Sequence, residues 1–330
     1  MNDLSVPSSR FVWGPISWYG LLIVIGIILA VYLSIRESKR LQLPEDTILD
    51  LSLWILPSGI IGARLYYVLF SPQTFLENPV SILYIWEGGL AIYGGLIAGF
   101  LAIAFFCRKR KLSMLMMLDI LVPGVVLAQS IGRWGNYFNQ EAYGVSLAPN
   151  SFLAFFPMAV QIPSGNGFVW HAATFFYESL LDFAIFLFLL WGRRKIFHRK
   201  GDSFLFYLLL YGAGRLIIEQ LRMDSLYLGR SVRISQLISV LLVLFVYTCF
   251  AVRYIRMKKC GSFERLIPFI PWIFAIPVLL FCCGFLPSTD SRPMLILFLS
   301  CYSLIMIFSA FRLYYSFHGE EIVYADHKAV

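Results

Sequence analysis

The chain has 330 residues, of which 59% are hydrophobic and only 14% are charged, and its mean hydropathy is +0.75. Soluble globular domains carry about 25% charged residues, so this composition excludes a soluble protein. The net charge of +8 would suit a nucleic-acid-binding protein, but the basic residues lie in short clusters between long apolar stretches. We therefore interpret the chain as a polytopic membrane protein.

Nine apolar stretches are each long enough to cross a bilayer as a helix, which takes about 20 residues. The sequence predicts them at 16–35, 49–70, 88–106, 113–131, 174–191, 203–221, 232–252, 267–286 and 294–313. Strands of a membrane barrel would alternate in polarity, whereas runs such as Phe183 to Leu190 are apolar on every side. The first stretch lacks a small-residue cleavage site, so we expect it to remain as an anchor. The predicted fold class is all-α and polytopic.

Basic residues mark one side of the membrane. They follow the first, third, fifth and seventh spans, in segments 36–40, 108–111, 193–200 and 253–259. By the positive-inside rule these loops are cytoplasmic. We therefore expect a multi-pass plasma-membrane protein whose N-terminus is outside and whose C-terminus is cytoplasmic.

The cysteines indicate neither disulfides nor a metal site. All six lie in predicted spans or at their cytoplasmic ends, and none lies in an outer loop, so no disulfide framework is implied. The chain has no CxxC pair, and its four histidines lie far from the cysteines in sequence, which is not typical of zinc sites. We expect no metal and no cofactor.

Every basic residue on the predicted outer side is an arginine: Arg10, Arg64, Arg133, Arg215, Arg222, Arg230, Arg233 and Arg292. Guanidinium pairs bidentately with phosphate and keeps its charge when partly buried, which suits a membrane-embedded phosphate site. Arginines at span ends also simply extend to lipid headgroups, and we interpret Arg10, Arg230 and Arg292 in this way. Arg64 differs, because it lies in an otherwise uncharged stretch, where an ionisable residue favours a functional role.

Two further clusters are predicted at outer span ends. Arg215, Glu219 and Arg222 stand at i, i+4 and i+7, so they line one helical face. This spacing fits either an internal ion ladder or, because two arginines face one glutamate, a positive surplus for an anion. At the start of the fifth span, Glu178 and Asp182 also share a face at i, i+4.

Polar residues also crowd the end of the fourth span. Arg133, Asn136, Asn139 and Glu141 lie within nine residues of one another, a polarity that helix packing alone does not require. The two asparagines are an i, i+3 pair of amides that can bond to glycerol hydroxyls. The outer loop at about 133–173 combines turn residues with several aromatic ones, which predicts a small folded head.

These residues carry a family resemblance. Segment 132–144, Gly-Arg-Trp-Gly-Asn-Tyr-Phe-Asn-Gln-Glu-Ala-Tyr-Gly, resembles the signature of the bacterial prolipoprotein diacylglyceryl transferases. Supporting motifs follow in the family's order across about residues 10–260: Ser17 to Gly20, Gly62 to Arg64, Gly88-Gly89, Tyr93 to Leu96, Tyr177-Glu178, Arg215 with Glu219 and Arg222, and Ser235-Gln236.

The resemblance implies an enzyme that moves the diacylglyceryl group of phosphatidylglycerol onto the lipobox cysteine of a prolipoprotein, forming a thioether and releasing glycerol phosphate. It implies a seven-span core with an external head, residues 1–260, followed in this chain by two additional spans and a cytoplasmic tail, residues 261–330. The residues it assigns to catalysis are Arg133, Arg215 and Tyr93. Those it assigns to phosphatidylglycerol binding are Arg133, Asn136, Asn139, Glu141, Gly144, Tyr19, Arg64, Glu219 and Arg222.

The chain departs from the common family pattern at two places. Tyr93 stands where many members have histidine, and His171 to Thr174 reads His-Ala-Ala-Thr where many have His-Pro-Ser-Gln. A phenol titrates near pH 10 and an imidazole near about 6.5, so Tyr93 is a poor resting base. Either Tyr93 is a hydrogen-bond partner, or the field of Arg215 and its neighbours stabilises the cysteine thiolate directly.

Two other functions fit parts of the pattern. A transporter would carry polar residues near mid-bilayer in repeated halves, whereas the charges here lie toward outer span ends and no second copy of 132–144 is present. A non-catalytic member of the same family is the other alternative, because of Tyr93.

Overall fold

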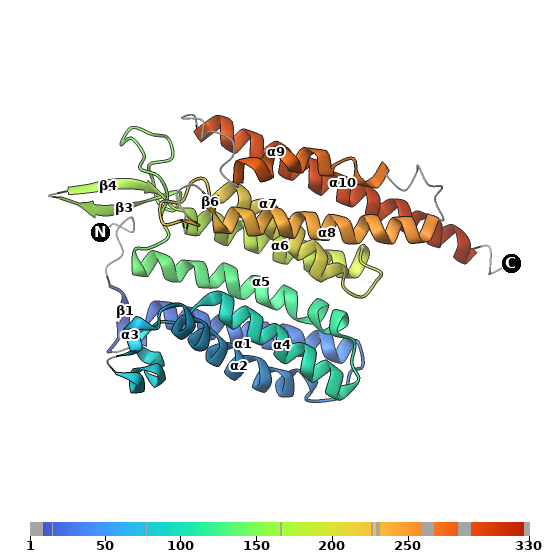
Figure 1. Cartoon of the computed structure of the whole chain (residues 1–330), viewed down its shortest axis with the longest axis horizontal. Helices are drawn as coiled ribbons and strands as arrows, with labels where there is room; N and C mark the ends of the chain where they lie inside the picture. Colours follow the sequence, from blue (N-terminus) through green and yellow to red (C-terminus); the bar gives the residue numbers. More distant parts are fainter. Residues whose placement is uncertain are drawn as a thin grey trace. The chain divides into compact units, whose positions relative to one another are not determined.

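A computed structural model of the chain describes residues 9–14, 16–76, 78–165, 167–225, 227–228, 232–258, 267–282 and 292–326. Within them, long helices dominate and the strands form short ribbons (Figure 1). Seven of the helices are long and apolar enough to cross a membrane: α1 (Trp18–Arg40), α2 (Thr47–Phe70), α4 (Ile92–Arg110), α5 (Met114–Asn139), α6 (Thr174–Lys195), α8 (Ile234–Lys258) and α10 (Arg292–Asp326). The predicted all-α polytopic fold is confirmed.

The other two predicted spans correspond to shorter helices. The sixth is α7 (Asp202–Ile218), which ends before the predicted residue 221 because the chain turns at 219–222. The eighth begins with a 3-10 turn, η3 (Ile267–Phe269), and continues as α9 (Trp272–Cys282). The 11 residues of α9 rise about 16 Å, or roughly half of a bilayer core. Residues 283–286 lie outside the described residues, so a complete eighth span stays a prediction.

The chain divides into two compact units. One comprises Met1–Gly26, Val126–Ile196 and Leu205–Val330, and the other comprises Ile27–Val125 and Phe197–Phe204. We call them the first and the second unit. The predicted domain boundary between 260 and 261 lies outside the described residues, so it also stays a prediction.

In the second unit, α2 and α4 pack closely through small residues. A side chain on Gly62 would collide with the carbonyl of Gly94 and with Ala98, and one on Gly94 would collide with the backbone of Gly62. Small residues at such positions let membrane helices approach each other. The connection between the two helices is built from α3 (Gln73–Leu76) and two 3-10 turns, η1 (Pro79–Leu83) and η2 (Ile85–Glu87).

The first unit contains α6, α7, α8, α9 and α10 together with the strands. β3 (Ala159–Ser164) and β4 (Gly167–Ala172) form an antiparallel hairpin, β1 (Phe11–Trp13) pairs with β2 (Ile16–Ser17), and β5 (Tyr227–Leu228) pairs with β6 (Val232–Arg233). The β3–β4 hairpin extends beyond the ends of the neighbouring helices (Figure 1). It lies within the predicted head segment 133–173.

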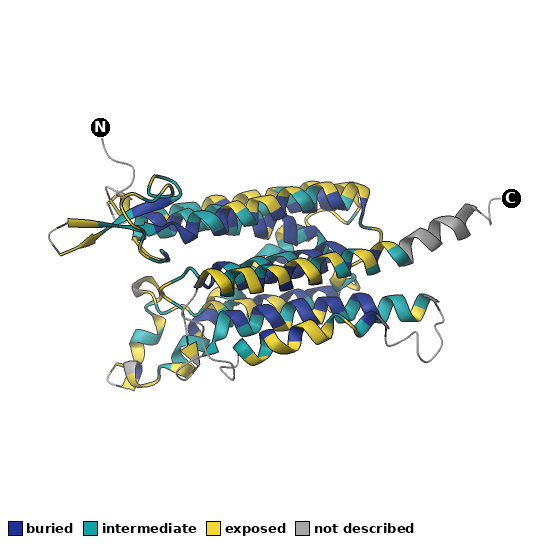
Figure 2. Ribbon diagram, turned by 90° about the horizontal axis from the view of Figure 1, so that it is seen from above, coloured by how far each residue is buried: buried dark blue, intermediate teal, exposed yellow. Residues whose placement is uncertain are grey.

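The helices carry both buried and exposed residues (Figure 2), and many of the exposed residues are large and apolar. On α6, Ile185 and Leu189 are buried, whereas Leu180 and Leu187 are at least half exposed. Exposed apolar surface of this extent is unfavourable in water and is what lipid contact requires. The pattern therefore supports the interpretation of these helices as membrane spans.

Candidate active site

A cluster of charged side chains surrounds one buried carboxylate, that of Glu178 in the first turns of α6. Arg133 Nη2 of α5 lies 2.6 Å from Glu178 Oε2. On the other oxygen, Arg215 Nη1 of α7 donates a hydrogen bond to Oε1, and Arg222 Nη1 lies 3.1 Å from the same atom. We call Arg133, Glu178, Arg215, Glu219 and Arg222 the arginine cluster.

The side chains of the arginine cluster are largely buried, except that of Arg133, which is partly exposed to solvent. The Glu178 side chain is 4% exposed, and those of Arg215 and Arg222 are 14% and 11% exposed. Arg133 is the most accessible, at 24%. Arg133 is therefore the arginine of the cluster that is most accessible to a ligand.

Local structure explains how the α7 residues reach Glu178. Arg215 and Glu219 form an i, i+4 ion pair of 2.8 Å, as predicted for one helical face. Arg222 lies beyond the helix, in the turn at 219–222, so the predicted i+7 continuation of that face is wrong. The turn brings the Arg222 guanidinium to Glu178 and also to Asp224. Nε donates to Asp224 Oδ1 at 3.0 Å, and Nη2 donates to Asp224 Oδ2 at 2.7 Å.

The charges of the cluster are more balanced than the sequence indicated. The segment 215–222 alone has two arginines against one glutamate, but the structure adds the carboxylates of Glu178 and Asp224. Burial lowers the pKa of Arg222, yet Glu178 and Asp224 outweigh burial and raise its pKa. Arg222 is protonated in any case. With Glu178, Glu219 and Asp224 facing Arg133, Arg215 and Arg222, the predicted positive surplus is not a property of the resting cluster.

Two more ionisable residues lie beside the cluster. Arg233 donates to the backbone carbonyl of Glu219 and, at 3.1 Å, to the hydroxyl of Tyr227. Asp182, one helical turn after Glu178, is 1% exposed, and neither of its carboxylate oxygens has a hydrogen-bond partner among the described residues. Asp182 interacts electrostatically with Arg133 and Arg215.

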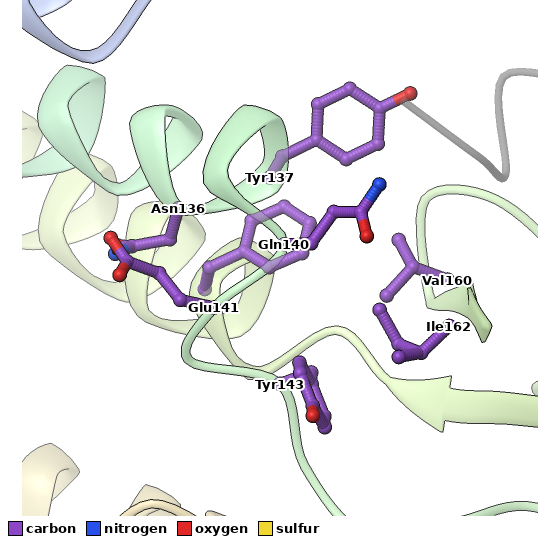
Figure 3. A pocket seen from close by; sticks show the side chains of 8 residues that line it. Asn136, Tyr137, Gln140, Glu141, Tyr143, Val160 and Ile162 are labelled. Carbon is purple, nitrogen blue, oxygen red and sulfur yellow. The ribbon is translucent and has the colours of Figure 1, made fainter. Parts of the chain in front are cut away.

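Asn136, Asn139 and Glu141 form a separate polar group at the end of α5. Both amide nitrogens donate to Glu141 Oε1, at 3.0 Å and 3.1 Å. Figure 3 shows Asn136 and Glu141 side by side, with Val160 and Ile162 of β3 on the other side of Gln140. The cavity among these residues holds about 10 Å³, roughly one water, so it is too small for a lipid headgroup.

Tyr19 connects this polar group with the arginine cluster. Its ring contacts the backbone of Gly135, where a side chain would overlap it. Its hydroxyl is within electrostatic range of both Glu141 and Arg133. The structure therefore brings together Tyr19, Arg133 and Glu141, as the site prediction requires.

Gly144 holds the signature segment against the turn that carries Arg222. It forms an antiparallel bridge with Arg222, and its N–H donates to Ala172 O at 2.7 Å. A Cβ at this position would lie 2.7 Å from Leu221 O and 2.8 Å from Thr174 Cγ2. Glycine is therefore required for close approach of the two backbones, and His171 Nδ1 donates to the Gly144 carbonyl at 2.8 Å.

Arg64 belongs to the second unit and has a different environment. Its side chain donates to five backbone carbonyls of the α2–α4 connection: those of Ser81 (2.6 Å), Ile82 (2.9 Å), Tyr84 (3.4 Å), Gly88 (2.6 Å) and Gly89 (3.1 Å). A guanidinium has five N–H donors, so these carbonyls can use all of them. Arg64 is 7% exposed, and the geometry gives it a structural task in this connection.

The glycines beside Arg64 have the backbone that this arrangement needs. Gly88 and Gly89 have φ of +93° and +67°, a region that L side chains rarely adopt. A side chain on Gly89 would also overlap the guanidinium of Arg64 and the ring of Tyr67. The predicted third span therefore begins as a helix only at Ile92.

Tyr93 lies in the first turn of α4, where it is partly buried. It belongs to the second unit together with Arg64, whereas Arg133, Arg215, Glu219, Arg222, Tyr19, Asn136, Asn139, Glu141 and Gly144 all belong to the first. The catalytic role predicted for Tyr93 stays a prediction.

The residue absent from the predicted site is Glu178, which is the centre of the cluster. The sequence contained a signal for it, because Glu178 and Asp182 are ionisable residues inside an apolar span, and such residues indicate function by default. The position of Arg133 was also described incompletely. It lies on α5, which continues to Asn139, and not in a loop that begins at residue 133.

The sequence comparisons agree with this geometry. The sequence model of the prolipoprotein diacylglyceryl transferase family matches residues 10–252. A phosphatidylglycerol–prolipoprotein diacylglyceryl transferase of Enterococcus faecalis is 48% identical over 236 residues, which are 70% of this chain and 84% of the relative. The enzyme of the same name from Limosilactobacillus reuteri is 42% identical over 80% of this chain and 93% of its own length.

A third relative of that name, from Streptococcus mutans, is 46% identical over 70% of this chain and 88% of its own length. The region matched by the family model, residues 10–252, includes the arginine cluster and the helices that carry it, and it ends before α9 and α10. The chain belongs to the prolipoprotein diacylglyceryl transferase family.

Proposed function

We propose that this chain is a transferase that moves the diacylglyceryl group of phosphatidylglycerol onto the cysteine of a prolipoprotein. The observation that carries the proposal is the convergence of Arg133, Arg215 and Arg222 on one carboxylate, at the end of a bundle of predominantly apolar helices. Arginines in this arrangement recognise planar or tetrahedral oxyanions. Family membership and the names of the relatives support phosphatidylglycerol and prolipoproteins as substrates.

The chemistry explains the need for arginines. The cysteine sulfur attacks the glyceryl carbon next to the phosphate, the carbon–sulfur bond forms, and the carbon–oxygen bond to phosphate breaks. Glycerol phosphate leaves with the bonding electrons, and the thiol proton passes to a base or to the leaving group. Negative charge develops on the phosphate oxygens, where preorganised guanidinium donors lower the barrier.

We assign the first contact with the phosphate to Arg133, because it is the most accessible arginine of the cluster. In the proposal, the phosphate takes over from Glu178 as the partner of Arg133, while Glu178 keeps Arg215 and Arg222 in place. Asn136, Asn139 and Glu141 contact the hydroxyls of the glycerol headgroup from outside the small cavity that Asn136 and Glu141 line. Tyr19, which interacts electrostatically with both Glu141 and Arg133, contacts the same headgroup.

The remaining predicted residues have supporting roles in the proposal. Gly144 keeps the signature segment close to Arg222, and Arg64 shapes the connection before α4 instead of contacting phosphate, because its donors face carbonyls. Tyr93 contributes a neutral hydrogen bond. The protein substrate is a signal peptide whose lipobox cysteine supplies the thiol.

An activity measurement tests the proposal. The purified full chain in nanodiscs would receive phosphatidylglycerol with a labelled headgroup and a lipobox peptide, and we expect release of glycerol phosphate matched by a mass gain on the peptide cysteine. A peptide with serine in place of cysteine is the control and should give neither product. Absence of both products with the cysteine peptide would favour a non-catalytic family member, and flux of intact lipid without products would favour a transporter.

The same proposal places the site on the external side of the membrane, following the positive-inside pattern. Cysteine labelling from outside intact cells should reach Asn150→Cys but not Lys195→Cys, both of which are exposed positions. Labelling of position 195 from outside would show that the orientation in the membrane is the opposite of the proposed one.

A further inference from the structure

An apolar cavity of about 500 Å³ lies within the first unit among α6, α7 and α10. Its lining extends from Leu181 to Phe188 on α6, from Leu210 to Ile217 on α7 and from Ser300 to Phe311 on α10. At a rise of about 1.5 Å per residue, these stretches are roughly 10 to 16 Å long. The cavity is therefore long and narrow and runs along the helices.

One end of the cavity begins at the level of the arginine cluster. Leu181 is three residues after Glu178 on α6, a rise of about 4.5 Å, and Gly214 directly precedes Arg215 on α7. The opposite end is closed by rings, because Phe311 contacts Phe188 and Phe206 at centroid distances of 5.9 Å and 4.8 Å. The cavity thus leads away from the charged groups toward an aromatic floor.

The lining residues are mostly apolar, which favours a hydrocarbon chain as the bound group. Ser300 and Ser303 are the polar residues of the lining, and Ser303 Oγ already donates to Ala213 O at 3.2 Å. A peptide backbone placed here would lack partners for its N–H and C=O groups, which is costly in an apolar environment. A helical peptide is about 10 Å across, so even a 10 Å length would fill roughly 800 Å³, more than the cavity offers.

The cavity also opens sideways. Ala184 on α6 and Leu304 on α10 both line it and are exposed, Leu304 to 66%. A chain can therefore enter from the lipid without passing through the protein. An extended hydrocarbon advances roughly 1.3 Å per bond of about 1.5 Å, so 10 to 16 Å accommodates roughly 8 to 12 carbons.

From these observations we infer that the cavity holds an acyl chain of the phosphatidylglycerol whose phosphate binds at the arginine cluster. This inference rests on the proposed function, and it adds a role for α10, which lies after the family-matched residues 10–252. The C-terminal segment of this chain then supplies one wall of a tail site and sets how much of the acyl chain is enclosed before the aromatic floor.

Filling the cavity tests the inference. Ile307→Trp enlarges a lining residue near the aromatic floor, and Phe308→Trp makes the same change at the neighbouring residue, which is 70% exposed and does not line the cavity. The full chain of each variant would be assayed with dioleoyl and with dihexanoyl phosphatidylglycerol. Overfilling a packed site costs at least about fivefold in an equilibrium or rate, and a six-carbon chain that starts at the arginine cluster does not reach the floor. We therefore expect Ile307→Trp to lose fivefold or more in kcat/KM with the long-chain lipid only. Phe308→Trp should match the unchanged chain with both lipids.

A second measurement does not depend on turnover. Phosphatidylglycerol with a photoreactive diazirine near the middle of one acyl chain should label peptides that contain 181–188, 210–217 and 300–311, and Ile307→Trp should abolish this labelling while Phe308→Trp keeps it. Equal long- and short-chain losses, or labelling that survives Ile307→Trp, would overturn the inference. Equal labelling by a phosphatidylethanolamine probe would also overturn it, because the site would then hold any membrane lipid. Absence of transfer by the unchanged chain would instead contradict the proposed function alone.

Discussion

Arg64 of the second unit and the three arginines of the cluster in the first unit have different kinds of partners. In the second unit, Arg64 donates to five backbone carbonyls of one connection and lies 5.2 Å from the Phe75 ring centroid. In the first unit, Arg133, Arg215 and Arg222 share the carboxylate of Glu178. In both arrangements the guanidinium groups have hydrogen-bond acceptors in place of water. Only in the first unit are these acceptors charged, so that the carboxylate neutralises the arginines.

The difference separates a structural arginine from one that can exchange its partner. Carbonyls of irregular backbone are fixed in place, and losing Arg64 leaves several of them buried without a donor, which is costly. A side-chain carboxylate can yield an arginine to another anion of similar geometry, such as a phosphate. The partners of a buried arginine therefore indicate its role better than its position in a span does, and four substitutions test this comparison.

We expect the largest effect from Glu178→Gln. This change keeps the size of the side chain but removes the charge that faces three arginines, and breaking a buried ion pair on one side costs about 3 to 5 kcal/mol. Thermal unfolding in detergent should show this loss. Asp224→Asn is the matched control, because Asp224 is 48% exposed and exposed pairs are worth at most about 1 kcal/mol. Equal losses in the two variants would show that Glu178 is not the centre of the cluster.

Arg133→Lys should have the next largest effect, on catalysis. A lysine keeps the charge but not the fork that binds two phosphate oxygens, and removing one preorganised donor costs about 10²- to 10³-fold in kcat. Insertion and the elution profile in detergent should stay unchanged. Arg10→Lys, at an exposed residue outside the cluster, should keep full activity. Near-normal turnover by Arg133→Lys would remove phosphate binding from the proposed role of Arg133.

A third substitution, Arg64→Lys, should affect stability more than chemistry. Three ammonium donors cannot replace five guanidinium donors, and unsatisfied buried carbonyls cost about 1 to 3 kcal/mol. We expect a lower unfolding temperature and faster proteolysis at 71–91, with KM for phosphatidylglycerol within about twofold. Arg110→Lys is the control in the same unit, because Arg110 is exposed and pairs with Asp50 at 2.5 Å. A large rise in KM without loss of stability would assign Arg64 to the lipid site after all.

The sequence predicted the helices well because hydropathy marks the bilayer, and it predicted their ends less well for the same reason. α1 continues to Arg40 and α5 to Asn139, beyond the predicted residues 35 and 131, because a helix can continue into the polar interface where hydropathy falls. The described part of the eighth predicted span is the 11-residue helix α9. Because residues 283–286 lie outside the described residues, the end of that span stays a prediction.

The sequence predicted which residues belong to the site but not which of them contact one another. Arg133, Arg215 and Arg222 were identified because charge is rare in spans and the signature segment is specific. Glu178 as their shared partner depends on the packing of α5, α6 and α7, which no local pattern encodes. The cage around Arg64 was equally unpredictable, since its acceptors are backbone carbonyls, which every residue has.

The smallest effect should come from Tyr93, which lies in the second unit with Arg64 and replaces the histidine of many family members. If Tyr93 only contributes a neutral hydrogen bond, Tyr93→Phe should cost about 0.5 to 1.5 kcal/mol, or roughly a two- to twelvefold loss in rate. If it takes the cysteine proton, the loss should approach the 10²- to 10⁴-fold typical of a positioned base. We expect the smaller effect, because a phenol titrates near pH 10 and holds its proton at neutral pH. The measurement is kcat/KM for Tyr93→Phe beside Tyr93→His. A loss beyond about a hundredfold in the first, restored in the second, would show that the second unit supplies the base and that the division between structural and catalytic residues does not follow the two units.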